Sequence, residues 1–226
     1  MKAEEIFSAA LETLRKGGTI LYPTDTVWGL GCDATNPEAV AKIFEIKRRS
    51  EAKSLVLLAS DLDMVAKYIK EIPSIAIDLV EVNDAPMTII YPGAIVSHPN
   101  NQRLPGAPIS HPNNQRLPGA PMSTPLSSGD RWHLAWNAVA EDGSVGIRIP
   151  LSEWCKQLIF KLGRPIVSTS ANISGEPTPK RFTEIPAEIK EAVDFVVPPS
   201  VDKESTGKAS QIIKVGLTGE IEIIRK

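Results

Sequence analysis

The sequence predicts an α/β fold, in which helices cover a β-sheet. Short apolar runs that read as strands alternate with amphipathic helical segments along most of the chain. The 226 residues, 42% of them apolar and with a net charge of −2, suffice for one domain with a sizeable core. Polar motifs follow several of the apolar runs, and ligands of open α/β sheets gather at strand ends. We therefore expect a single domain over 1–226 with a ligand site at its strand ends.

The first half of the chain is expected to begin with a helix over about 3–16, which a pair of glycines stops. A second helix, over 36–47, has Asn36 as its N-cap and Pro37 at its first helical position, and both favour a helix start. The other elements expected before residue 95 are strands over 19–22, 54–59 and 87–91 and helices over about 61–70 and 73–82.

The alternation resumes after residue 133. The elements expected there are strands over 144–149, 165–168 and near 193–197, 210–215 and 220–225, with helices over 151–162 and near 183–191.

Between the two halves, residues 95–133 are rich in proline and have almost no apolar periodicity. The twelve residues SHPNNQRLPGAP at 97–108 recur at 110–121, a period of thirteen. Two copies are too few for a solenoid. We expect an irregular insertion that adds little to the core and lies outside the nucleotide site, and either a recent duplication or engineering would produce it.

The most informative motif is PTDTVWGLG, Pro23–Gly31, which directly follows the first strand. Its proline has no amide hydrogen and cannot extend a central strand. Thr24, Asp25 and Thr26 offer short polar groups on a turn, and the two glycines allow close backbone approach. The run favours a ligand-binding loop, and the alternative is an ordinary turn with capping residues.

Two further polar clusters follow later elements. Lys47 and Arg49 end the helix over 36–47, and we expect both to point at solvent or at a phosphate; the alternative is helix-end chemistry with the dipole. The strand at 165–168 runs into the serine-rich stretch 168–172, whose small polar groups would make a cradle for phosphate and ribose oxygens. The alternative there is a serine-rich turn.

Histidine and metal chemistry is not expected. All three histidines, His98, His111 and His133, lie in the irregular segment, and the first two have no third ligand nearby. Cys32 and Cys155 form no metal-like spacing, and we interpret them as reduced thiols. With no apolar leader and no long apolar stretch, we expect a cytoplasmic protein without a membrane partner.

Six motifs stand in order along nearly the whole chain: GGTILYPTDTVWGLG, KRR before SLVLLAS, PMTIIYPG, EDGSVGIRIP, PIVSTSANISGEPTP, and SQIIKV before IEIIRK. This series resembles the YrdC/YciO family of threonylcarbamoyl-AMP synthases. The resemblance implies a YrdC-like twisted mixed β-sheet flanked by helices, with a concave ligand-binding face. Leu58 stands where two-domain relatives have a histidine, and their second domain is missing, which implies the single-domain, YciO-like branch.

The resemblance also implies roles for residues at matching positions. Threonine would be held by Thr26 and Arg148. The catalytic, phosphate-handling residues would be Lys47, Arg49, Ser170 and Asn172. The nucleotide-binding residues would be Lys53, Thr88, Ser168, Ser210 and Arg225. Judged from the residues alone, Arg148 and Arg225 could instead form strand-end ion pairs.

The implied reaction converts L-threonine, bicarbonate and ATP to threonylcarbamoyl-AMP and pyrophosphate, which is nucleotidyl transfer. Mg²⁺ would accompany ATP, held mostly by phosphates and water, and no structural metal is expected. The product would pass to separate proteins that form threonylcarbamoyladenosine on tRNA. Two alternatives stay open: an RNA-binding or translation-associated factor for tRNA or another double-stranded RNA, with weak or no synthase activity, and an enzyme for another small amine or acid.

Overall fold

The computed structural model describes residues 2–49, 55–97 and 132–226. In these residues the strands form one nine-stranded sheet, in the order β11-β10-β4-β7-β3-β8-β2-β1-β9, and a two-stranded sheet of β5 and β6. The strands are β1 (Ile20–Tyr22), β2 (Gly29–Gly31), β3 (Val56–Leu58), β4 (Met87–Tyr91), β5 (Val96–Ser97), β6 (Leu134–Ala135), β7 (Val145–Arg148), β8 (Ile166–Ser170), β9 (Phe195–Val196), β10 (Gln211–Val215) and β11 (Ile221–Arg225). Parallel and antiparallel pairs alternate irregularly, so the sheet is mixed.

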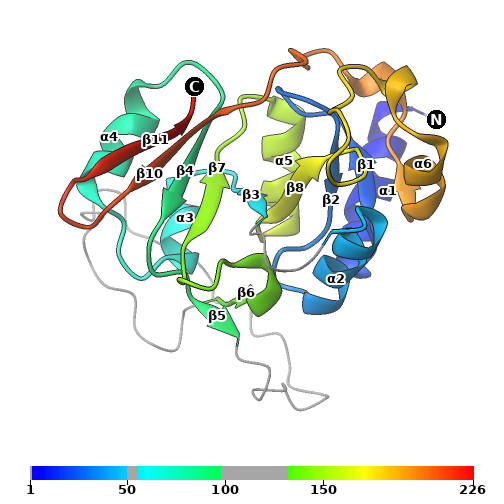
Figure 1. The fold of residues 1–226 in the computed structure, drawn as a ribbon. Helices are drawn as coiled ribbons and strands as arrows, with labels where there is room; N and C mark the ends of the chain where they lie inside the picture. Colours follow the sequence, from blue (N-terminus) through cyan, green and yellow to red (C-terminus); the bar gives the residue numbers. More distant parts are fainter. Residues whose placement is uncertain (1, 50–54, 98–131) are drawn as a thin grey trace.

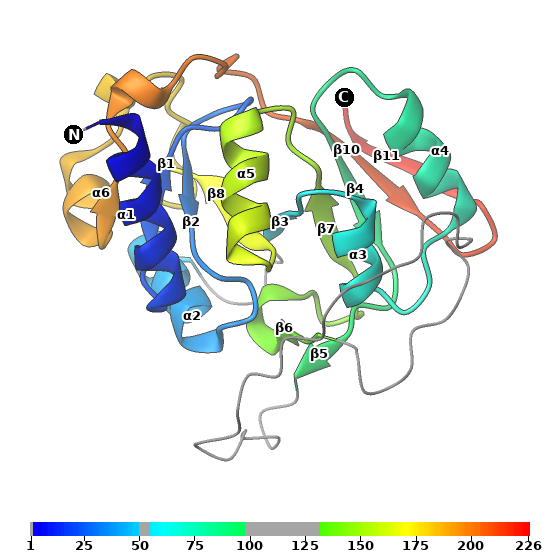
Figure 2. The ribbon, with the colours of Figure 1, turned by 180° about the vertical axis from the view of Figure 1, so that it is seen from behind.

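Helices flank this sheet on both sides. They are α1 (Ala3–Arg15), α2 (Pro37–Ile46), α3 (Leu62–Tyr68), α4 (Ser74–Val82), α5 (Glu153–Leu162) and α6 (Ala187–Ala192), with 3-10 turns at Trp136–Ala138, Phe182–Glu184 and Pro199–Val201. Helices α1, α5 and α3 lie across the sheet in Figure 2. From the opposite side, in Figure 1, the strands β4, β7 and β8 lie in front, and α2 and α6 lie toward β1. The predicted α/β class and the twisted mixed sheet flanked by helices are confirmed.

Strand register separates a buried face of the sheet from a more open one. One row across β4, β7, β3 and β8 consists of Ile90, Gly146, Val56 and Ser168. The adjacent row consists of Ile89, Ile147, Leu57 and Val167. The second row is at most 2% exposed, whereas three members of the first row are half-buried. Alternate residues point to opposite faces, and the next row on the face of the first row is buried: Thr88, Arg148, Leu58 and Ile166. We therefore use the term open face only for the region around the first row.

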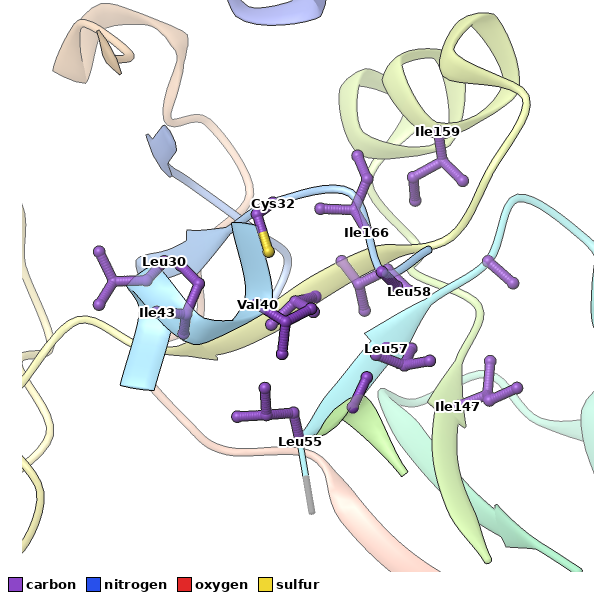
Figure 3. Close-up of a cluster of buried hydrophobic side chains, with 14 of the residues drawn as sticks. Leu30, Cys32, Val40, Ile43, Leu55, Leu57, Leu58, Ile147, Ile159 and Ile166 are labelled. Atoms are coloured by element: carbon purple, nitrogen blue, oxygen red, sulfur yellow. The ribbon is translucent and has the colours of Figure 1, made fainter. Parts of the chain in front are cut away.

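The core fixes α2 and α5 against the middle strands. Val40 and Ile43 of α2 and Ile159 of α5 gather with side chains of β3 and β8 (Figure 3). Leu57 and Leu58 of β3 are fully buried in this cluster. Burying a side chain of this size contributes about 1.5–3 kcal/mol to folding. The C-terminal end of α2, which carries the basic cluster, is therefore held by its own apolar face.

Both ends of α2 have defined caps. At the start, Asn36 Oδ1 accepts hydrogen bonds from the amides of Glu38 (3.0 Å) and Ala39 (3.1 Å), as the sequence predicted. At the end, Arg48 N donates to Glu45 O and Arg49 N to Phe44 O, both at 3.0 Å. These are the two bonds of a Schellman motif, whose left-handed position usually holds glycine. Here Arg48 occupies it, with φ +49°.

Most predicted elements are present, and besides the unpredicted strands β5 and β6 there are two differences. A short strand, β2, contains the glycines that the sequence suggested for close approach. A Cβ on Gly31 would lie 2.6 Å from Tyr22 Cε1 and 2.8 Å from Val167 O, so only glycine fits between these neighbours. The helix expected near 183–191 is divided into a 3-10 turn and α6, since Pro186 stands at the break.

The predicted insertion, 95–133, lies mostly outside the described residues, but its two ends belong to the fold. Ile95 is 9% exposed and its amide donates to Tyr68 O at 2.8 Å. The strands β5 and β6 pair in parallel, with Val96 opposite Leu134. The expectation that the whole segment adds little to the core is therefore wrong at its ends, and it stays a prediction for 98–131. No helix in the described residues combines the length and apolar character needed to cross a bilayer.

Candidate functional site

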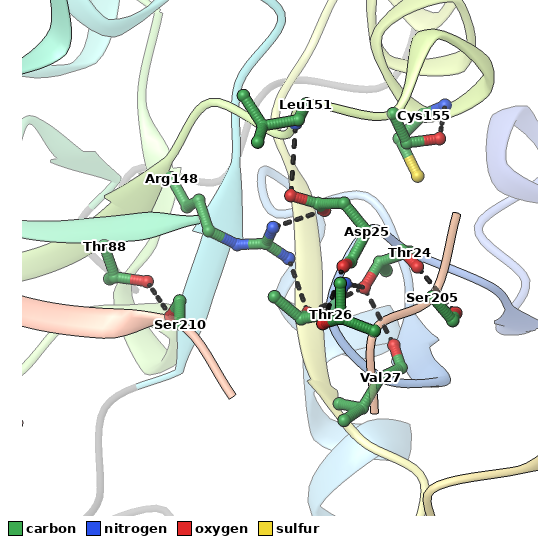
Figure 4. A network of polar contacts seen from close by, with 12 residues as sticks. Thr24, Asp25, Thr26, Val27, Thr88, Arg148, Leu151, Cys155, Ser205 and Ser210 are labelled. Carbon is green, nitrogen blue, oxygen red and sulfur yellow. Dashed lines mark hydrogen bonds and ion pairs between the residues drawn. The ribbon is translucent and has the colours of Figure 1, made fainter. Parts of the chain in front are cut away.

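The loop between β1 and β2 carries a buried ion pair. Asp25 accepts a hydrogen bond from Arg148 Nη1, and the two side chains are 5% and 4% exposed. The other carboxylate oxygen of Asp25 accepts from the amide of Leu151 at 3.1 Å (Figure 4). Arg148 ends β7, so the ion pair fixes the loop to the centre of the sheet. The strand-end ion pair, one of the two interpretations of Arg148, is present.

Two threonines complete what we call the Arg148 network: Thr24, Asp25, Thr26 and Arg148. Thr24 Oγ1 donates to Val27 O at 2.8 Å and accepts from Thr26 N at 3.1 Å. The two threonine hydroxyl oxygens are 2.8 Å apart, and Thr26 Oγ1 accepts from Arg148 Nη2 at 3.2 Å. Because the Thr24 proton goes to Val27, the Thr26 proton must go to Thr24. Thr26 Oγ1 thus has one acceptor site left for a ligand.

A second set, the Ser210 cluster, consists of Thr88, Ser210 and Arg225. The hydroxyl oxygens of Thr88 and Ser210 are 2.8 Å apart, and both residues are buried. Arg225 donates to Ser210 O from Nε at 2.9 Å and from Nη2 at 2.7 Å. Thr88 stands directly opposite Arg148 in the β4–β7 pair, so this cluster and the Arg148 network are neighbours (Figure 4).

A third set, the Lys47 cluster, consists of Lys47, Ser170 and Asn172. Lys47 Nζ donates to Ser170 O (2.6 Å), Asn172 O (2.8 Å) and Asn172 Oδ1 (3.3 Å). Ser170 Oγ donates to Asn172 Oδ1 at 2.5 Å, and Asn172 Nδ2 donates to Glu176 O at 2.7 Å. Lys47 is only 2% exposed, so the expectation that it points at solvent is wrong, whereas its action on phosphate stays a prediction. Its three N–H groups meet three oxygens of the turn after β8.

Burial affects the charges of this region. It lowers the pKa of Lys47 to about 8, with the positive charge of Arg49 as a second cause. Burial also lowers the pKa of Arg49, which is half-buried just after the Schellman turn. The Lys47 cluster adjoins the loop, because Ser170 pairs with Gly29 and Ala171 N donates to Trp28 O at 3.1 Å.

The remaining predicted positions are less connected. Ser168 lies half-buried on the open face, and a Cβ on Gly29 would lie 3.3 Å from its Oγ. Lys53, His98 and His111 lie outside the described residues, and His133 is exposed. In the described part of the chain, no group of three or more His, Cys, Asp or Glu side chains is placed to hold a metal ion.

The buried cysteine beside the site is not poised as a nucleophile. Cys155 Sγ donates to Pro23 O at 3.4 Å, and burial raises the pKa of the thiol to about 12. A thiol in that state stays protonated at neutral pH. Both Cys155 and Cys32 are free.

Sequence reasoning named Asp25 only as one polar group of the loop and gave no role to Ser205 and Thr206, which the structure also brings to the site. Asp25 is the partner of Arg148. Ser205 Oγ donates to Thr24 O at 2.7 Å, and Thr206 Oγ1 donates to Asp25 O at 3.2 Å. The available signal was the Ser-Thr-Gly run just before the strand at 210–215, which repeats the polar and glycine-containing character of the first motif.

Comparison with known proteins agrees with the fold and with the order of the motifs. The Sua5/YciO/YrdC family model, whose description is "Telomere recombination", matches residues 12–116 and 113–226. A threonylcarbamoyl-AMP synthase of Xanthomonas campestris pv. campestris (strain B100) is 30% identical over 217 residues, 94% of each chain.

Solved structures share the fold. P. abyssi Sua5 complexed with L-threonine superposes with a TM-score of 0.69 at 23% identity; the match covers 95% of this chain and 52% of that one, so this chain spans about half of Sua5. E. coli YciO superposes with a TM-score of 0.66 at 20% identity, covering 100% of this chain and 91% of that one. Together with the family model and the Xanthomonas relative, these matches show that the chain belongs to the Sua5/YciO/YrdC family.

Proposed function

We propose that the protein is an L-threonylcarbamoyladenylate synthase, a nucleotidyltransferase that uses L-threonine, bicarbonate and ATP. The observation that carries the proposal is the pairing of Thr88 with Arg148 across β4 and β7. It makes neighbours of the Arg148 network, suited to an amino acid, and the Ser210 cluster, suited to a nucleotide. A relative that shares 30% identity over 94% of the chain is named threonylcarbamoyl-AMP synthase.

The Arg148 network has the donors and acceptors that threonine requires. Thr26 Oγ1 has one acceptor site left, which suits the amino group of a ligand better than its carboxylate. Arg148 has five N–H donors, and its bonds to Asp25 and Thr26 use two of them. The others would bind the α-carboxylate or the carbamate, through the charge-assisted bonds that guanidinium groups favour.

The phosphates would lie toward the Lys47 cluster. Lys47, Arg49, Ser170 and Asn172 are its proposed phosphate-handling residues. As placed, Lys47 donates to backbone oxygens, so it would act by its buried positive charge and by holding the turn after β8. Ser168 on the open face, Lys53 and the Ser210 cluster would contact the rest of the nucleotide.

The chemistry needs positioned charge rather than a nucleophilic side chain. The amine of threonine and bicarbonate give a carbamate and water. A carbamate oxygen then forms a bond to the α-phosphorus of ATP, while the bond from that phosphorus to the bridging oxygen breaks and pyrophosphate leaves. The attacking oxygen carries no proton, so this step requires no general base. Alignment and electrostatic stabilisation can supply most of the acceleration in such transfers.

Mg²⁺ would reach the site with ATP. Asp25, the buried carboxylate of the Arg148 network, already accepts from Arg148 and Leu151, which makes it a poor metal ligand. The ion would therefore be held mostly by phosphate oxygens and water, and would neutralise phosphate charge. The product would serve tRNA modification through separate transfer proteins.

A pyrophosphate-release assay tests the proposal. We expect release that requires both L-threonine and bicarbonate and that is weaker with serine, valine or alanine in a panel at equal concentration. Pyrophosphate release with another amino acid of the panel, and none with L-threonine, would make that amino acid the substrate. RNA binding with a steep salt dependence, together with no ATP consumption under any of these conditions, would support the RNA-binding alternative instead.

A further inference from the structure

A single segment touches both halves of the proposed site. Residues 197–210, here called the strap, connect β9 at one edge of the sheet to β10 near the other (Figure 1). Seven steps between neighbouring strands separate β9 from β10. At about 4.8 Å a step this is about 34 Å on a flat sheet, and the strap could span about 50 Å if fully extended. The 3-10 turn at Pro199–Val201 shortens this reach by only about 4 Å, so the strap is long enough to cross the sheet.

The strap bonds to three successive carbonyl oxygens of the Arg148 network. Ser205 Oγ donates to Thr24 O at 2.7 Å. Thr206 donates to Asp25 O from its amide at 3.3 Å and from Oγ1 at 3.2 Å, and Gly207 N donates to Thr26 O at 2.7 Å. These bonds fix the backbone whose side chains pair with Arg148.

Both ends of this contact are anchored. Upstream, Asp202 accepts from Trp28 Nε1 at 2.7 Å and from Ser205 N at 3.2 Å, so the buried indole also holds the strap. Downstream, Gly207 adopts φ +69°, a conformation that other residues reach only with strain. Three residues later the strap ends at Ser210, the centre of the Ser210 cluster.

We propose that Ser205 and Thr206 are positioning residues and that the strap couples the two substrate sites. The inference rests on the proposed function. A nucleotide that orders Ser210 would hold the strap, and the strap would hold Thr24, Asp25 and Thr26 in the arrangement that binds threonine. The ligand that binds first loses binding free energy to the conformational entropy of ordering the strap. The second ligand then binds to an ordered strap and therefore binds more tightly. Thermodynamic linkage requires each ligand to raise the affinity of the other by the same factor.

The test is calorimetric titration of the full chain with L-threonine, with and without saturating α,β-methylene-ATP and Mg²⁺. In the unmodified protein we expect the analogue to tighten threonine binding by about fivefold or more, and threonine to tighten analogue binding equally. In Ser205→Ala and Thr206→Val we expect this factor to fall toward one, with affinity for the analogue alone within about twofold of the unmodified protein. Ser205→Thr, which keeps the hydroxyl, should restore the coupling.

Ser200→Ala, an exposed serine in the same strap, is the matched control and should leave the coupling unchanged. A coupling factor that Ser205→Ala leaves unchanged, in a protein whose melting temperature is also unchanged, would overturn the inference alone. Equal loss of coupling in Ser200→Ala would overturn the assignment to Ser205. If the unmodified protein binds neither threonine nor the analogue, the proposed function fails and the inference fails with it.

Discussion

Lys47 Nζ lies 2.6 Å from the carbonyl oxygen of Ser170, a contact between residues 123 positions apart in the sequence. The bond joins the end of α2 to the end of β8, and a second bond, from the amide of Ser174 to Lys47 O at 2.9 Å, joins α2 to the turn that follows β8. A lysine that could act on phosphate is therefore also a structural link between two motifs of the site.

The first prediction follows from that link. Lys47→Ala should lower the free energy of unfolding by about 1–3 kcal/mol, because it leaves Asn172 O without a donor and removes one of the two donors of Ser170 O and of Asn172 Oδ1. Turnover should fall as well, by about tenfold or more. Urea denaturation measures the first effect and pyrophosphate release the second. Lys42→Ala, an exposed lysine of α2, should change stability by less than about 0.5 kcal/mol. Equal stability of the two variants would refute the structural role of Lys47.

The second prediction concerns pH. With a pKa of about 8, Lys47 loses its charge as pH rises through 8, so turnover should decline above that pH. Its pKa in the unfolded chain is about 10.4. Between these values the unfolded state binds more protons, and the contribution of Lys47 to the unfolding free energy rises with pH. Above pH 8, turnover should therefore fall while the contribution of Lys47 to the unfolding free energy rises. A loss of turnover in this range is thus not caused by unfolding.

Lys47→Arg is the comparison variant for the pH experiment, since arginine keeps its charge throughout this range. Its turnover, measured from pH 7 to 10 beside melting temperatures, should show no decline centred near 8. If the turnover of Lys47→Arg declines with the same midpoint pH as that of the unmodified protein, a group other than Lys47 titrates.

The third prediction separates stability from binding at the buried ion pair. Asp25→Ala should cost about 3–5 kcal/mol, because it leaves the charge of Arg148 buried without its partner. The double variant Asp25→Leu with Arg148→Met should recover most of this loss, since an apolar pair of similar volume is often neutral. Calorimetry should detect no threonine binding in the double variant. Threonine binding at unmodified affinity there would remove Arg148 from the site.

The fourth prediction concerns the left-handed residue of α2. Arg48 pairs with Glu188, but the two side chains are 67% and 48% exposed, so the pair adds little. Arg48→Gly and Arg48→Ala both lose the pair, and only glycine adopts φ +49° without strain. We expect the glycine variant to be more stable than the alanine variant by about 1 kcal/mol in thermal or urea denaturation. The reverse order would mean that Arg48 is not strained.

Local signals predicted most of the fold, and long-range contacts account for what they missed. The N-cap at Asn36 and the strands over 87–91 and 210–215 depend on neighbouring residues, which the sequence displays. In the sequence, the glycines of β2 look like turn residues. Their reason is a tertiary contact, the packing of Tyr22 against Gly31, which the sequence does not display. Likewise, no periodicity reveals that Lys47 is buried, because its acceptors belong to a distant motif.

The last prediction redesigns the connection between β5 and β6. These strands are parallel, so the chain leaves Ser97 at the far end of β5 and must return to the start of β6. Ser97 stands opposite Ala135, three residues beyond Trp132, so the gap from Ser97 to Trp132 is about 11 Å. A connection of only two or three residues would have to be almost fully extended to span this gap. A linker of about eight Gly and Ser residues in place of 98–131 should close it without strain.

We expect this variant to fold and to gain about 1 kcal/mol of stability, since each halving of loop length saves about 0.6 kcal/mol of closure entropy. Joining Ala94 to Leu134 through two or three residues should instead destabilise, because it removes Ile95, whose burial contributes about 1.5–3 kcal/mol. Denaturation of the two variants, with pyrophosphate release measured on both, separates the outcomes. Unfolding of the first variant would make 98–131 an integral part of the domain. If it folds but loses all turnover, the deleted residues take part in catalysis as a lid, and His133 beside the junction becomes the next residue to substitute.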